Sequence, residues 1–188
     1  MTLEIAFDLD DGDLARFREL FSEASEKAAG MTADEIVQGA RELVKGPLVN
    51  EAPAFVRQRL EALAALIGMV EDDGWQLPEA ERKQVLGALG YFIKAKDIID
   101  DATPVLGLLD DAIAAEIVLR GLQHEIDAYR DFTEFRDAET ARRIQKGLPA
   151  DVSRDDWLAD RRATLHSRMR DRRSADTQGW HTFTLYDI

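Results

Sequence analysis

The chain has 188 residues, of which 45% are hydrophobic, no cysteine, and a formal net charge of -13 at pH 7. This length and apolar content fit a single globular body, and the missing cysteines exclude disulfides and thiolate chemistry. The acidic balance argues against binding of nucleic acid or anionic lipid, because both are recruited by clustered Lys and Arg.

The charge divides the chain into two parts. Residues 1–140 contain 14 Lys and Arg against 30 Asp and Glu, whereas residues 141–188 contain 10 against 7. We therefore expect an acidic helical domain over residues 1–140. Over residues 141–188 we expect an arginine-rich helix and a C-terminal strand, docked on the same domain. No apolar run approaches the roughly 20 residues that span a bilayer, so we expect a cytoplasmic protein without a transmembrane segment.

Apolar residues alternate from Leu3 to Leu9, which predicts a short strand, and then recur at helical spacings, which predicts amphipathic helices. The predicted helices begin near Asp13, Thr32, Pro53, Pro78, Asp110 and Ser153. The fifth continues to Phe132 and is the longest, and the loop between the third and fourth makes these two an antiparallel hairpin. Alternation returns from Trp180 to Ile188 and predicts a second strand, which would pair with the first.

Together these elements predict a mainly α fold. We expect about six helices in a bundle-like domain, with a minor two-stranded ribbon formed by the chain termini. Thr32 and Glu35 are spaced as a capping box at the start of the second helix.

Five aspartates stand among apolar residues in the stretch from Tyr91 to Asp111. They are Asp97, Asp100, Asp101, Asp110 and Asp111. With the sequence Thr103-Pro-Val-Leu-Gly107 between them, this order resembles the signature of the YkvA-like family, a bacterial domain of unknown function, over about residues 85–120. Where the family's motif carries proline, this chain has Ala95 and Asp100. The resemblance implies a small helical fold and supplies no catalytic residues, because the family's own activity is not established.

The aspartates allow two interpretations. Clustered carboxylates suit hard cations such as Mg²⁺, Mn²⁺ and Ca²⁺. The metal candidates are Asp97, Asp101, Asp110 and Asp111. Their spacing fits neither an EF-hand loop nor the Glu-x-x-His pairs of di-iron bundles. The favoured interpretation is structural: Asp97 caps a short turn, and Asp110 or Asp111 caps the fifth helix, each cap stabilising it by about 1 kcal/mol.

The remaining candidates favour structure over chemistry. Glu116, Arg120 and His124 follow at four-residue steps, which is typical of a solvated ion-pair stripe. The aromatic residues at helical spacing are interpreted as core; they are Tyr91, Phe92, Tyr129, Phe132 and Phe135. The arginines after residue 150 alternate with aspartates, so we expect them to dock on the acidic body or on a partner, not on nucleic acid.

These patterns support no enzyme class. Our leading hypothesis is a non-enzymatic interaction or adaptor module of the bacterial cytoplasm, without a cofactor, that binds a protein partner or self-associates. The alternative is a carboxylate-metal-dependent enzyme centred on the aspartate cluster of residues 97–111.

Overall fold

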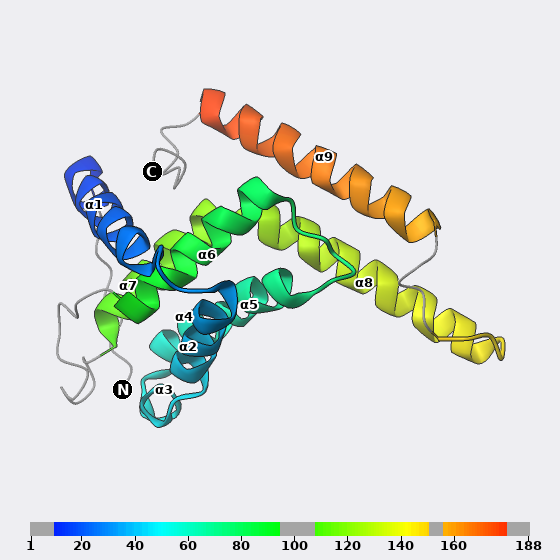
Figure 1. Ribbon diagram of the computed structural model, residues 1–188, viewed down its shortest axis with the longest axis horizontal. Helices are drawn as coiled ribbons and strands as arrows, with labels where there is room; N and C mark the ends of the chain where they lie inside the picture. The colour runs from blue at the N-terminus through cyan, green and yellow to red at the C-terminus, as the bar shows by residue number, and fades with distance from the viewer. Residues whose placement is uncertain (1–9, 95–107, 151–155, 180–188) are drawn as a thin grey trace, which may run out of the picture.

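The computed structural model describes residues 10–94, 108–150 and 156–179, and the regular structure in these ranges is entirely helical (Figure 1). In chain order the helices are α1 (Asp11–Ala28), α2 (Ala33–Lys45), α3 (Pro47–Glu51), α4 (Ala54–Ala62), α5 (Ala64–Glu71), α6 (Glu79–Lys94), α7 (Leu109–Gly121), α8 (Gln123–Gln145) and α9 (Asp156–Gly179). The predicted mainly α, bundle-like fold is confirmed. The two segments of the predicted ribbon, residues 3–9 and 180–188, lie outside the described ranges.

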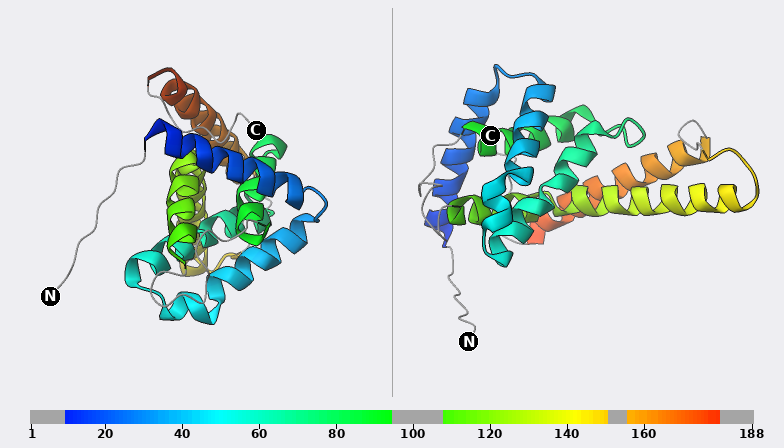
Figure 2. Two further views of the ribbon diagram at one scale, coloured as in Figure 1. Left: turned by 90° about the vertical axis from the view of Figure 1, so that its left-hand side faces the viewer. Right: turned by 90° about the horizontal axis from the view of Figure 1, so that it is seen from below.

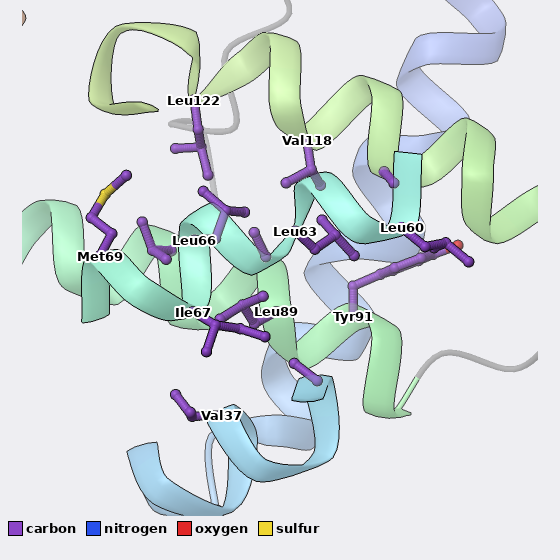
Figure 3. Close-up of a cluster of buried hydrophobic side chains, with 14 of the residues drawn as sticks. Val37, Leu60, Leu63, Leu66, Ile67, Met69, Leu89, Tyr91, Val118 and Leu122 are labelled. Atoms are coloured by element: carbon purple, nitrogen blue, oxygen red, sulfur yellow. The ribbon is translucent and has the colours of Figure 1, made fainter. Parts of the chain in front are cut away.

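The core lies where α4, α5, α6 and α7 meet (Figure 3). Leucines from three of these elements fill it, since Leu60, Leu66 and Leu89 are completely buried. α1 and α2 both pack on α6 and cover one side of this core. Burial of this apolar surface drives the folding of the domain.

Two of the predicted helices are each divided into two. The predicted third helix breaks at Leu63 into α4 and α5, and the predicted fifth helix breaks at Leu122 into α7 and α8. Leu122 leaves helical geometry with φ -107° and ψ 20°. Both residues are fully buried leucines. Leu63 keeps right-handed helical dihedrals, with φ -62° and ψ -20°, so helical propensity is overridden only at Leu122. α3, which starts with Pro47 at its first position, was not predicted.

Side-chain caps start the first two helices. Thr32 and Glu35 form the predicted capping box at α2, with the Glu35 backbone N–H donating to the Thr32 hydroxyl over 3.2 Å. Asp10 and Asp13 form a second capping box at α1. These caps satisfy backbone N–H groups that have no partner inside the helix.

The last two helices run side by side, and their connected ends extend beyond the rest of the molecule (Figure 2). We call the end of this hairpin the arm. It consists of residues 137–148, which are the end of α8 and the three residues after it, and of residues 156–161, which begin α9. Helices α1 to α7 and the first half of α8 form the body. No helix among the described residues is long and apolar enough to cross a membrane.

Candidate functional site

Buried polar side chains gather where α9 meets the body. The loop between α5 and α6 lies at the centre of this region and inserts Trp75, which is completely buried. The Trp75 ring stacks at tilted angles against Tyr129 and Phe132 of α8, with centroids 5.8 and 5.1 Å away. From α9, Arg162 donates a hydrogen bond of 2.9 Å to the carbonyl of Gly74 in the same loop. The loop therefore joins α5, α6, α8 and α9.

Arg173 of α9 bridges two buried carboxylates on different helices. Its guanidinium lies 2.8 Å from Glu81 Oε1 of α6 and 2.9 Å from Glu125 Oε1 of α8. The same guanidinium donates to the Gln84 side-chain oxygen over 3.3 Å. The Glu125 side chain is 0% exposed and that of Glu81 is 4% exposed. We call these four residues the Arg173 cluster. Because a buried carboxylate needs a partner, the cluster ties α9 to both α6 and α8.

A second ion pair anchors the other side of the loop. Asp72 accepts from Arg136 of α8 with both carboxylate oxygens at 2.8 Å, and from the Tyr129 hydroxyl at 3.1 Å. Asp72 also accepts from the backbone N–H groups of Gly74 and Trp75. Burial, followed by the charge of Asp72, raises the pKa of Tyr129 to about 12. Tyr129 therefore stays protonated at neutral pH and acts as a hydrogen-bond donor.

His166 of α9 lies against the Trp75 ring. The two rings meet edge to face with centroids 4.2 Å apart, and His166 is buried. Burial lowers the pKa of His166 to about 4, helped by the nearby charge of Arg170. The imidazole is therefore neutral at pH 7. Its Nε2 atom and the Trp75 indole nitrogen are buried without a hydrogen-bond partner among the described residues.

This arrangement is suited to holding a helix in place. Its carboxylates are engaged by guanidinium groups, its tyrosine is protonated, and its histidine is neutral and enclosed by the protein. Within residues 10–94, 108–150 and 156–179, no group of three or more Asp, Glu or His side chains could hold a metal ion.

The aspartates predicted as metal candidates are only partly within the described ranges. Asp97 and Asp101 lie outside them. Asp110 is buried and Asp111 is half-buried, and both lie in the first turn of α7, where the helix dipole favours negative charge. The N-cap position itself is held by Leu108, so neither aspartate is the cap residue that the sequence predicted.

Two members of the predicted ion-pair stripe pair on α7. Glu116 lies 2.7 Å from Arg120 and is also reached by Arg59 of α4 at 3.3 Å. The third member, His124, lies beyond the break at Leu122, in α8. The predicted aromatic core is confirmed for Tyr91 and Phe132, which are buried. Phe135 differs: it is 38% exposed and is covered by the Arg161 guanidinium, 5.1 Å from its ring centroid.

The Arg173 cluster was missed by sequence reasoning. Glu81 and Glu125 look like ordinary surface residues of acidic helices, and Arg173 looks like one of many arginines in α9. The signal that could have found them is positional: Glu125 lies three residues before Ala128 and seven before Phe132, on the face that the core residues mark. A charged residue on the apolar face of a helix calls for a buried partner.

Exposed apolar side chains mark two further places. Ile144 is 60% and Leu148 is 49% exposed at the end of the arm. Gly147, with φ 68°, closes this end in a Schellman motif, in which the Leu148 and Gly147 N–H groups donate to the Arg143 and Ile144 carbonyls. At the start of α3 and of α4, Leu48 is 47% and Phe55 is 51% exposed.

Comparison with known proteins gives one family match. Residues 82–116 match a family described as "Protein of unknown function (DUF1232)". The matched stretch runs from α6 to α7 and includes the aspartates singled out in the sequence. The chain is thus similar over this stretch to an uncharacterised domain. No curated protein matches the chain, and no solved structure matches it.

Proposed function

We propose that this protein is a non-enzymatic interaction module that presents its arm to a protein partner. The observation that carries this proposal is the exposure of Ile144, 60%, at a helix end that a Schellman motif fixes. An isoleucine at that position contributes nothing to the core, and its exposure carries a hydration cost that a partner would remove. We further propose that residues 85–120 are a YkvA-like segment and that the protein acts in the bacterial cytoplasm.

The rigid mounting of the arm supports this role. The Arg173 cluster fixes the far end of α9, and Arg136 with Asp72 fixes α8 where it leaves the body. An arm held at both helices presents its end in one orientation. Such preorganisation lowers the conformational entropy lost on binding.

The competing proposal is a carboxylate-metal-dependent enzyme centred on Asp97, Asp101, Asp110 and Asp111. No specific observation among the described residues favours it. Addition of Mn²⁺, Mg²⁺ or Ca²⁺ at about 1 mM separates the two proposals, because an ion that binds the folded state raises the melting temperature. We expect no shift. A shift that Asp110→Asn removes would favour the metal enzyme.

Site-specific photo-crosslinking tests the interaction role. A photoreactive amino acid replaces Ile144 in the protein expressed in its native cells, and the matched control carries it at Lys83 of α6, whose side chain is 76% exposed on the body. We expect a discrete adduct from position 144 and none from position 83. Equal labelling at both positions, or none at either, would contradict the proposal.

A further inference from the structure

The contact between α9 and the rest of the molecule is rich in polar groups. Four polar or charged residues are buried among the residues that the structure describes, and three of them, Glu81, Glu125 and His166, lie at this contact. By comparison, α1 packs on α6 through apolar side chains such as Phe21, which stacks on Tyr91 with ring centroids 4.3 Å apart. The attachment of α9 therefore differs in chemistry from that of the helices around the core.

This polar contact makes α9 easier to detach than an apolar helix. A buried ion pair adds little net stability, because both charges regain hydration when they are exposed to water. Trp75 Nε1 and His166 Nε2 are buried without a hydrogen-bond partner among the described residues, so each gains one from water when α9 leaves. α9 lies along α8 at the edge of the molecule, and its outer side is exposed at Ser167, Arg168 and Asp171 (Figure 1). It can therefore leave without displacing another helix.

The surface beneath α9 presents acceptors for two guanidinium groups. At one end, the two carboxylates and the amide of the Arg173 cluster bind Arg173, and at the other end the carbonyl of Gly74 accepts from Arg162. Arg162 and Arg173 are 11 residues apart, which is about three turns, so both lie on one face of α9. Leu165 and Met169 lie between them on that face and are buried. The surface therefore fits a helix that carries an arginine at each end of a short apolar stripe.

We propose that α9 is an exchangeable occupant of this surface, and that a helix of another protein with the same pattern docks there in its place. The pattern is arginine at positions i and i+11 with apolar residues at i+3 and i+7, as in α9. The inference goes beyond the proposed role of the arm, because it assigns a second interaction surface. With α9 seated the arm keeps its orientation, and exchange releases it.

Charge favours a basic partner at this surface. Residues 1–140 contain 30 Asp and Glu against 14 Lys and Arg, whereas α9 contains six arginines and four aspartates. A basic helix is therefore attracted to the body, and an acidic helix is repelled. The outside helix must compete with α9, which is tethered and so present at a high effective concentration. Its apparent affinity is reduced by the small fraction of molecules in which α9 is detached.

Thiol labelling of the full chain tests whether α9 detaches, because the chain contains no cysteine of its own. Met169→Cys places one thiol beneath α9, at a side chain that is 1% exposed, and Ala115→Cys places one in the core, at 0%. Without denaturant, we expect position 169 to be labelled at least about tenfold faster than position 115, since detachment of one helix is a smaller opening than unfolding of the core. Leu165→Cys gives the same measurement at a second buried position of α9.

The decisive measurement adds a helical peptide as the outside occupant. One probe is a peptide of residues 156–179, and the other is an alanine-based helix of unrelated sequence that carries only the two arginines and the two apolar residues of the pattern. We expect both to speed the labelling of position 169 severalfold and to leave that of position 115 unchanged. Arg173→Ala in the first peptide should abolish the acceleration, whereas Arg172→Ala, at the exposed neighbouring position, should not.

Each outcome decides for or against the proposal. If position 169 is labelled no faster than position 115, or if the peptides leave its labelling unchanged, α9 is a permanent part of the fold and the proposal is wrong. If only the peptide of residues 156–179 acts, or if labelling rises with the concentration of the chain itself, the surface accepts α9 alone and the proposed class of partner is wrong. Photo-crosslinking at position 144 reports on the end of the arm, so the proposed function can fail while this inference stands, and the reverse.

Discussion

Arg173 is the side chain on which the docking of α9 depends most. One guanidinium serves two carboxylates from different helices, and the Glu125 side chain is completely buried. A buried carboxylate destabilises the folded state unless it is paired and hydrogen-bonded. The ion pairs therefore add little net stability, but without them the chain cannot fold with α9 in this position.

Replacement of this guanidinium should therefore be severe. We expect Arg173→Ala to lower the free energy of unfolding by about 3 kcal/mol, because two buried carboxylates lose their cation. Arg172→Ala, at the exposed neighbouring position, should cost less than about 0.5 kcal/mol. Urea denaturation measures both. Adding Glu81→Gln and Glu125→Gln to Arg173→Met should recover part of the lost stability. If Arg173→Ala and Arg172→Ala lower the free energy of unfolding by similar amounts, the Arg173 cluster does not hold α9 in place.

His166 makes stability depend on pH in a predictable direction. Its pKa is 6.5 when unfolded and about 4 when folded, so between these values the unfolded state binds more protons. The stability that His166 contributes is thus present above pH 6.5 and is lost as the pH falls towards 4. We expect a loss of about 3 kcal/mol over this interval.

The matched variant for this prediction is His166→Gln, which cannot be protonated. Chemical denaturation at pH 7 and at pH 4.5 gives the change in unfolding free energy for each protein. Carboxylates titrate in both proteins alike, so the difference between the two changes isolates His166. Equal pH dependence in the two proteins would show that the histidine is not buried in this way.

At the scale of elements, the close approach of two helices explains a glycine where helix propensity alone would favour alanine. A Cβ atom built at Gly90 of α6 would lie 2.8 Å from the Ala28 Cβ of α1. Glycine inside a helix costs about 1 kcal/mol relative to alanine, so this glycine is retained for packing and not for helix formation.

Gly90→Ala is accordingly expected to destabilise the protein by about 1–3 kcal/mol, although it raises helix propensity, because α1 must move away from α6. The swapped pair Ala28→Gly/Gly90→Ala moves the methyl group to the other helix and should recover most of the loss. Thermal unfolding of the single and double variants checks this. A Gly90→Ala protein more stable than the wild type would mean that the two helices are not in contact there.

At the scale of the whole molecule, the features that could be predicted from the sequence are those that depend on residues close together in the chain. Helical periodicity and the Thr32 capping box gave the start of most helices, because both depend on residues near in sequence. The divisions at Leu63 and Leu122 could not be predicted, because neither residue is a glycine, a proline or a capping residue that marks a helix end in the sequence. The Arg173 cluster could not be predicted either, since its partners lie 92 and 48 residues away.

Tryptophan fluorescence can report whether α9 lies on the body. The chain contains three tryptophans, at positions 75, 157 and 180. A chain ending at residue 150 therefore keeps Trp75 alone, and full-length Trp157→Phe/Trp180→Phe is its matched control. In the full chain, α9 covers this region with His166 and buries Leu158 and Leu165.

We expect the chain ending at residue 150 to unfold at a lower urea concentration than the control and to show Trp75 emission at a longer wavelength, because removal of α9 exposes the ring to water. Loss of Arg173 also leaves Glu81 and Glu125 without their guanidinium, which adds to the destabilisation. Addition of a peptide of residues 151–179 should return the emission towards the control value, and Arg173→Ala in that peptide should weaken the effect. If truncated and control proteins share one emission maximum and one urea midpoint, α9 does not cover Trp75, and the arm has no fixed mounting on the body.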